Sequence, residues 1–195
     1  MAAEAPHTMK IRFTMAEHMF AFIPPDDIPP EIHKPTQSAE DFIEALCQAS
    51  QWLPAIRYLA LALPRREAVW WAIAVRRHFE TDTKMPLAEV AAWSAAAKWV
   101  YEPTEDNRKA TFPLAETLKF STAAAYAALG AFYAAGNMAP EESKVFVPPG
   151  EGLTASMVAA SIILTCVDTK PSNIEVRQKT AIQIGSDIAF GGNGF

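Results

Sequence analysis

The sequence predicts an all-α protein, and three observations lead to that fold class. Apolar residues recur at helical spacing from Ser38 to Phe190, serines and threonines precede several of these stretches, and no stretch alternates repeatedly with a period of two. We expect seven to eight helices, packed in antiparallel pairs as an irregular bundle or a short solenoid, with an extended N-terminal arm. The arm is residues 1–37, and the helical domain is residues 38–195.

The arm differs in composition from the rest of the chain. Its prolines deny it a regular helix and favour extended backbone, and a more apolar piece precedes most of them. This composition is typical of an arm that docks on its own domain or on a neighbouring molecule, in which case homo-oligomers can form through it. A mobile tail is the alternative, because chain ends are often disordered.

The first helices of the domain are indicated by the residues at their N-terminal ends. Ser38 followed by Asp41 is a helix-start signal, and Ser50 is placed to cap a second helix with Pro54 in its first turn. Pro64 then opens a third helix with two adjacent tryptophans. Trp71 lies on one side with a stripe of apolar residues, namely Ala68, Ala72, Val75 and Phe79.

The remaining helices are predicted by the same signals. A polar piece at 106–109 is followed by a restart at Pro113, and residues 139–152 are a loop because prolines and glycines interrupt every periodic pattern there. The four helices expected around these segments are residues 86–101, the stretch from Ser121 or Thr122 to 135, residues 155–167 capped by Thr154, and 174–190 behind a capping box of Ser172 and Glu175.

The composition of the chain excludes several classes of function. The chain has 195 residues, 50% of them hydrophobic, and a formal net charge of -5, so we expect one domain and no nucleic-acid partner. No apolar run reaches the roughly 20 residues of a membrane-spanning helix, and the N-terminus lacks a secretory signal pattern. Cys47 and Cys166 have no metal-like spacing and are expected to be free thiols. We therefore expect a cytoplasmic protein.

Sequence motifs for catalysis are missing. The chain contains no phosphate-binding loop, dinucleotide fingerprint, nucleophile elbow or zinc-protease motif. Three of the four histidines fall in the arm, and His78 follows two arginines near a helix C-terminus, where positive charge complements the helix dipole. We assign no catalytic, cofactor-binding or metal-binding residue, and we expect a protein that is not an enzyme.

Three surfaces are candidates for binding a protein partner: the arm, the loop at 140–152, and a patch of Arg66, Trp70 and Arg77. Arginine and tryptophan are enriched at binding hot spots, although Trp70 also fits a second layer of the core with Val69 and Ile73. One alternative function is a small-molecule or enzymatic pocket lined by aromatic residues, namely Trp71, Trp93, Trp99, Tyr126 and Tyr133. Another is structural self-assembly through the arm.

Three stretches carry a resemblance to a known family: Leu63–Ala72, Ala96–Arg108 and Leu129–Phe132. Over residue 39 to the C-terminus, the chain resembles an uncharacterised family of all-helical bacterial proteins. Such proteins are similar to ones encoded near type VI secretion genes. The resemblance implies an adaptor or accessory role, and it assigns no site residues.

Overall fold

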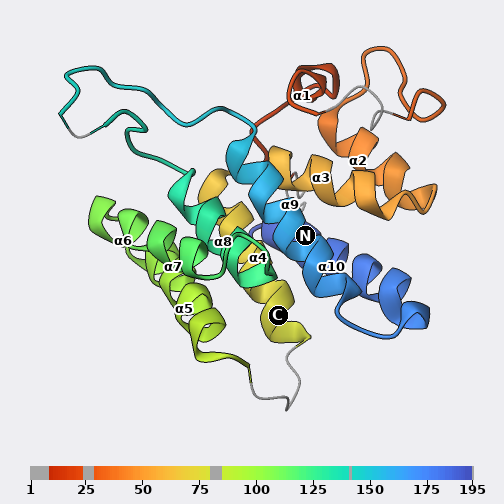
Figure 1. Ribbon diagram of the computed structural model, residues 1–195. Helices are drawn as coiled ribbons and strands as arrows, with labels where there is room; N and C mark the ends of the chain where they lie inside the picture. The colour runs from red at the N-terminus through yellow and green to blue at the C-terminus, as the bar shows by residue number, and fades with distance from the viewer. Residues whose placement is uncertain (1–8, 24–28, 80–84, 141, 195) are drawn as a thin grey trace, which may run out of the picture.

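The computed structural model describes residues 9–23, 29–79, 85–140 and 142–194, and within these ranges the predicted all-α class is confirmed. No β-strand forms there, and one isolated bridge joins Met15 to Ser38. The elements, drawn in Figure 1, are α1 (Glu17–Phe20), α2 (Ala39–Gln48), α3 (Trp52–Ala62), α4 (Arg65–His78), α5 (Leu87–Tyr101), α6 (Glu105–Lys109), α7 (Thr111–Thr117), α8 (Ala123–Phe132), α9 (Leu153–Val167), the 3₁₀ helix η2 (Pro171–Asn173) and α10 (Ile174–Ala189).

Helix α9 lies at the centre of the molecule and packs against α3, α4, α8 and α10. Helices α5, α6 and α7 lie on one side of this centre, and α2, α3 and α10 lie on the other (Figure 1). The short helix α6 adds to the longer ones that periodicity predicts, since a helix of one or two turns has too few apolar positions to show a stripe. Helix α7 begins at Thr111, two residues before the predicted restart at Pro113, and α1 forms within the apolar piece of the arm.

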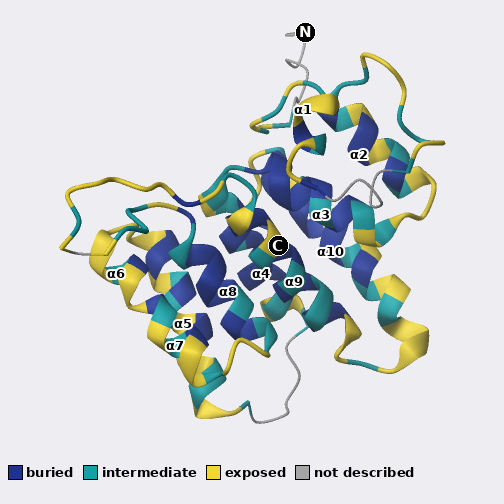
Figure 2. Cartoon of the chain, turned by 45° about the horizontal axis from the view of Figure 1, so that its top comes forward, coloured by how far each residue is buried: buried dark blue, intermediate teal, exposed yellow. Residues whose placement is uncertain are grey.

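The core is built around Trp71, whose side chain is fully buried as its apolar stripe predicts. Its indole Nε1 donates a hydrogen bond of 2.7 Å to the carbonyl oxygen of Ala181 in α10. Gly185, one turn further along α10, lies against the same ring. Figure 2 shows the buried residues as a continuous layer on the inner faces of the helices. The tryptophan therefore joins α4 to α10 by packing and by a hydrogen bond.

The described part of the arm packs against the helical body of its own chain. The backbone N–H of Lys10 donates to Ala189 at 2.7 Å, and that of Arg12 donates to Ala62 at 2.7 Å. Met19 on α1 is fully buried, and the ring of Phe20 lies 5.5 Å from that of Phe42 between centroids. Residues 1–8 and 24–28 of the predicted arm lie outside the described residues.

Two of the predicted helix caps form and three do not. Ser38 Oγ accepts from the N–H of Asp41 at 3.0 Å, and Thr122 Oγ1 caps α8. Ser50 instead adopts a φ of 56°, so α3 begins after Gln51. Helix α9 begins before Thr154, which is buried, and η2 replaces the capping box before α10.

Among the residues that the structure describes, no helix has the length and apolar character needed to cross a membrane.

The close packing of α10 on α4 predicts the effect of enlarging Gly185. A Cβ there would lie 2.6 Å from Cε2 of Trp71 and 2.8 Å from Cδ2 of Leu59, so the buried indole has to move. We expect Gly185→Ala to lower the free energy of unfolding by about 1–3 kcal/mol in urea titrations, despite the higher helix propensity of alanine. Gly150→Ala is the control, because its Cβ would meet its nearest atoms at 3.5 Å, an ordinary contact distance. Equal stability of both variants and the wild type would contradict this packing.

Candidate functional site

The segment between α8 and α9 projects from the body (Figure 1) and carries three consecutive apolar side chains that water reaches. This segment is named here the 137–149 loop and is described except for residue 141. In it the exposed fraction is 62% for Val145, 68% for Phe146 and 44% for Val147. Pro149 at its end is buried. An exposed run of large apolar side chains is uncommon on a monomer surface and is typical of interaction sites.

Asn137 fixes the backbone of this loop through its side-chain amide. Its Oδ1 accepts from the N–H of Val147 at 2.7 Å and from the N–H of Ala139 at 3.1 Å. Its Nδ2 donates to the carbonyl oxygen of Val145 at 3.2 Å, and the N–H of Met138 donates to that of Val147 at 2.8 Å. The loop is thereby tied to its own first residues, so its conformation does not depend on contact with a partner.

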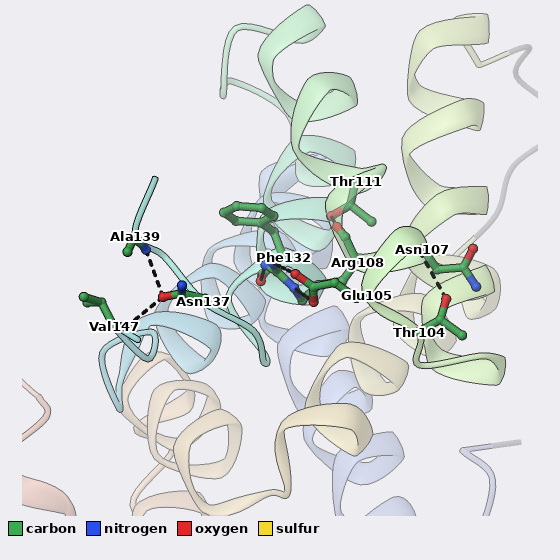
Figure 3. A network of polar contacts seen from close by, with 9 residues as sticks. All are labelled: Thr104, Glu105, Asn107, Arg108, Thr111, Phe132, Asn137, Ala139 and Val147. Atoms are coloured by element: carbon green, nitrogen blue, oxygen red, sulfur yellow. Dashed lines mark hydrogen bonds and ion pairs between the residues drawn. The ribbon is translucent and has the colours of Figure 1, made fainter. Parts of the chain in front are cut away.

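A buried arginine supports the base of the loop from α6 (Figure 3). Arg108 is 1% exposed, and it donates to both carboxylate oxygens of Glu105 and to the carbonyl oxygen of Phe132, each at 2.7 Å. Gly136, with φ of 86°, packs on this guanidinium, where a Cβ would lie 2.4 Å from Nε. Only glycine fits there, because both the backbone conformation and the space exclude a side chain. Arg108 therefore satisfies the end of α8 and sets the direction in which the loop leaves it.

Arg65 at the start of α4 holds the two ends of the projecting segment together. Its Nη1 donates to the carbonyl oxygen of Ala134 at 3.2 Å, and its Nη2 pairs with Glu151 at 3.0 Å. Glu151 also forms an ion pair with Arg12 of the arm. Charge-assisted hydrogen bonds of this kind are stronger than neutral ones, so both ends of the segment are anchored to the helical body.

The structure brings together two of the three residues of the predicted patch. The guanidinium carbon of Arg77 lies 5.1 Å from the ring centroid of Trp70, which is half-buried and donates from Nε1 to the carbonyl oxygen of Asn193 at 3.0 Å. Arg66 instead donates from Nε to the carbonyl oxygen of Val100 at 2.6 Å. These contacts hold α5 and the C-terminal residues against α4, and a partner-binding role for the patch stays a prediction.

The aromatic residues of the alternative pocket lie in different places. Trp71 and Trp99 are core residues, whereas Trp93 lines a cavity of about 720 Å³ and Tyr126 lines another of about 490 Å³. Neither of these two cavities is lined by another of the five residues. A small-molecule function stays a prediction, and these cavities do not combine the side chains that the sequence indicated.

Groups that carry chemistry are scattered in this fold. Cys47 and Cys166 are free thiols, and burial raises the pKa of Cys166 to about 12, which keeps it protonated at neutral pH. Over the described ranges, no three side chains from histidine, cysteine, aspartate and glutamate lie close enough to hold a metal ion.

Sequence reasoning singled out the loop at 140–152 but missed the residues that make it a site. The signal for Val145–Val147 was an apolar triplet between prolines and charged residues. No signal marked Arg108, because Asp106, Asn107 and Lys109 around it are typical of a solvated surface. Asn137 lies just after the expected helix that ends at residue 135, and no signal marked its role in the loop.

The ion pair under the loop predicts a pH dependence of stability. The Arg108 guanidinium lowers the pKa of Glu105 in the folded protein, so this contribution is present above the ordinary glutamate value of about 4.3 and is lost as pH falls through the lowered value. We expect Glu105→Gln to reduce the free energy of unfolding at neutral pH by about 1 kcal/mol, because the Glu105 carboxylate is half-exposed and screened. We expect urea titrations to show that this difference in the free energy of unfolding between the variant and the wild type becomes smaller in acid. Glu116→Gln, at an exposed position on α7, is the control. A deficit that is unchanged in acid would contradict the ion pair.

Comparison with known proteins identifies the family of this chain. No curated protein and no solved structure matches the chain. The model of one family, described as a family of unknown function (DUF6931), matches residues 42–189. This stretch contains α3 to α10 and the whole of the 137–149 loop, while the arm lies outside it. The match covers more than half of the length of the chain, so the chain belongs to the family DUF6931.

Proposed function

We propose that this protein is a non-enzymatic adaptor or accessory protein that binds a protein partner through the 137–149 loop. The observation that carries the proposal is the exposure of Val145, Phe146 and Val147 on a loop whose backbone is held by Asn137. Burial of these three side chains against a partner removes apolar surface from water, which favours association.

Preorganisation of the loop favours binding. A flexible apolar loop loses conformational entropy when a partner immobilises it, whereas a loop that is already fixed loses little. Asn137, Arg65 and Arg108 fix the loop in the free protein, so more of the free energy of apolar burial is available for binding. Aromatic residues are also the type most enriched at binding hot spots, which favours Phe146 as the anchor.

The finer features of the proposal come from the family resemblance. We propose a location in the bacterial cytoplasm and an association with type VI secretion, as the resemblance of Leu63–Ala72 and Ala96–Arg108 implies. Self-assembly through the arm is a competing proposal, but the side chain of Met19 is buried on its own chain and has to be released first.

Capture of a partner from extracts of the native cells tests the proposal. We expect the immobilised wild-type protein to retain a specific partner, and Phe146→Ser to retain at least about tenfold less, since removing a hot-spot side chain costs roughly 2 kcal/mol or more. The control is Val176→Ser on α10, because Val176 is 64% exposed and lies outside the loop. Equal retention by all three proteins, or loss by both variants, would contradict the proposal.

A further inference from the structure

The backbone of the loop has two edges that differ in their hydrogen bonding. On the inner edge, the N–H of Val145 donates to Ser143 Oγ at 3.2 Å, and its carbonyl oxygen accepts from Asn137 Nδ2. The N–H of Val147 donates to Asn137 Oδ1, and its carbonyl oxygen accepts from the N–H of Met138. Both backbone groups of Val145 and of Val147 are therefore bonded within the loop. Residues that alternate in this way lie on an extended strand, where the backbone groups of every second residue face the same side.

The outer edge of the same strand is open. The N–H and C=O groups of Phe146 have no hydrogen-bond partner among the residues that the structure describes. Phe146 is exposed. Because backbone N–H and C=O groups bond either to protein or to water, these groups are accessible to a neighbouring chain.

Asn137 completes the inner edge as a neighbouring strand would. Its carboxamide donates to the carbonyl oxygen of Val145 and accepts from the N–H of Val147, which is the pattern that one residue of a parallel strand makes with its neighbour. Residues 145–147 are thus bonded along one edge by Asn137, Ser143 and Met138, and their other edge is free, while the chain bends at Lys144. This arrangement prepares them to accept one more strand.

We infer that an extended segment of a partner protein adds to the outer edge of residues 145–147 as a β-strand; this inference rests on the proposed function and names its partner class. Main-chain hydrogen bonds to Phe146 give the pairing, and the exposed apolar side chains select an apolar segment. The Lys144 ammonium is exposed and has no ion pair among the described residues, so an acidic residue in the partner segment complements it.

A partner protein fits this edge better than a second copy of the chain. Stable dimers bury about 800 Å² on each subunit, far more than the side chains of Val145, Phe146 and Val147 provide. A second copy also brings a net charge of -5 and another Lys144 to the contact, and like charges repel. A small interface of this kind is typical of transient complexes, which suits an adaptor.

The probe for the test is a random peptide library displayed on phage and selected against the full-length wild-type protein. We expect the selected peptides to be apolar, to contain an acidic residue and to slow hydrogen exchange at the amide of Phe146. N-methylation of alternate peptide amides tests the pairing directly. Methyl groups on one set of alternate amides abolish binding, and methyl groups on the other set leave it unchanged, because only one edge of the peptide faces the loop.

Two substitutions at one position separate strand pairing from side-chain docking. Phe146→Pro removes the outward N–H and leaves the inner bonds of Val145 and Val147 in place, and Phe146→Ala removes the ring but keeps the N–H. Thermal melts of both variants verify folding. We expect Phe146→Pro to bind the peptides at least about tenfold more weakly than Phe146→Ala does, since pairing is lost as well as the ring.

The other outcomes overturn the inference in distinguishable ways. Equal weakening by both variants would mean that Phe146 docks by its side chain, which leaves the proposed function intact. Failure to select any peptide that contacts the 137–149 loop would also overturn strand pairing, while the capture experiment judges the proposed function separately. A wild-type dimer in sedimentation that becomes monomeric in Phe146→Pro would assign the edge to a second copy.

Discussion

The buried guanidinium of Arg108 is the interaction on which the shape of the candidate site depends. An arginine that is 1% exposed is tolerated only when its hydrogen-bonding groups are satisfied, and here Glu105 and the carbonyl oxygen of Phe132 satisfy them. Because Gly136 packs on this guanidinium with a positive φ, the chain turns there in a fixed direction. The 137–149 loop therefore takes its position from a charge buried under the end of α8.

Rigidity of the loop also depends on the helices that support it. Helix α9 follows the loop directly and packs against α3, α4, α8 and α10, so its first turn is fixed by most of the core. Arg65 of α4 reaches both ends of the projecting segment from the same core. The packing of Trp71 against Gly185 keeps α4 in register with α10. Core packing and site geometry are thus joined through α4 and α9.

Much of the fold could be predicted from local patterns. Ser38 and Thr122 cap helices as expected, and the stripe that includes Trp71 is buried, because these features depend on neighbours in sequence. The predicted capping box of Ser172 and Glu175 does not form, because the 3₁₀ helix η2 leads directly into α10. Burial of Arg108 could not be predicted, since its main partners besides Glu105 are a carbonyl and a glycine that follow it by more than twenty residues.

The proposed site has the same mixture of predictable and unpredictable parts. The prolines and glycines of 139–152 indicated a loop, and the loop was one of three predicted contact surfaces. That Asn137 pairs its amide with Val145 and Val147 depends on three-dimensional geometry that no spacing rule contains. The arginine-tryptophan patch, in contrast, was selected on residue type alone, and its side chains make contacts within the chain.

The central claim is that the exposed loop is rigid before any partner binds. Backbone ¹⁵N relaxation of the free protein measures this directly through the order parameters of Val145, Phe146 and Val147. We expect values close to those of the helices, about 0.85, because both ends and the inner edge of the loop are bonded. Values below about 0.6 would show a flexible loop and would contradict its preorganisation.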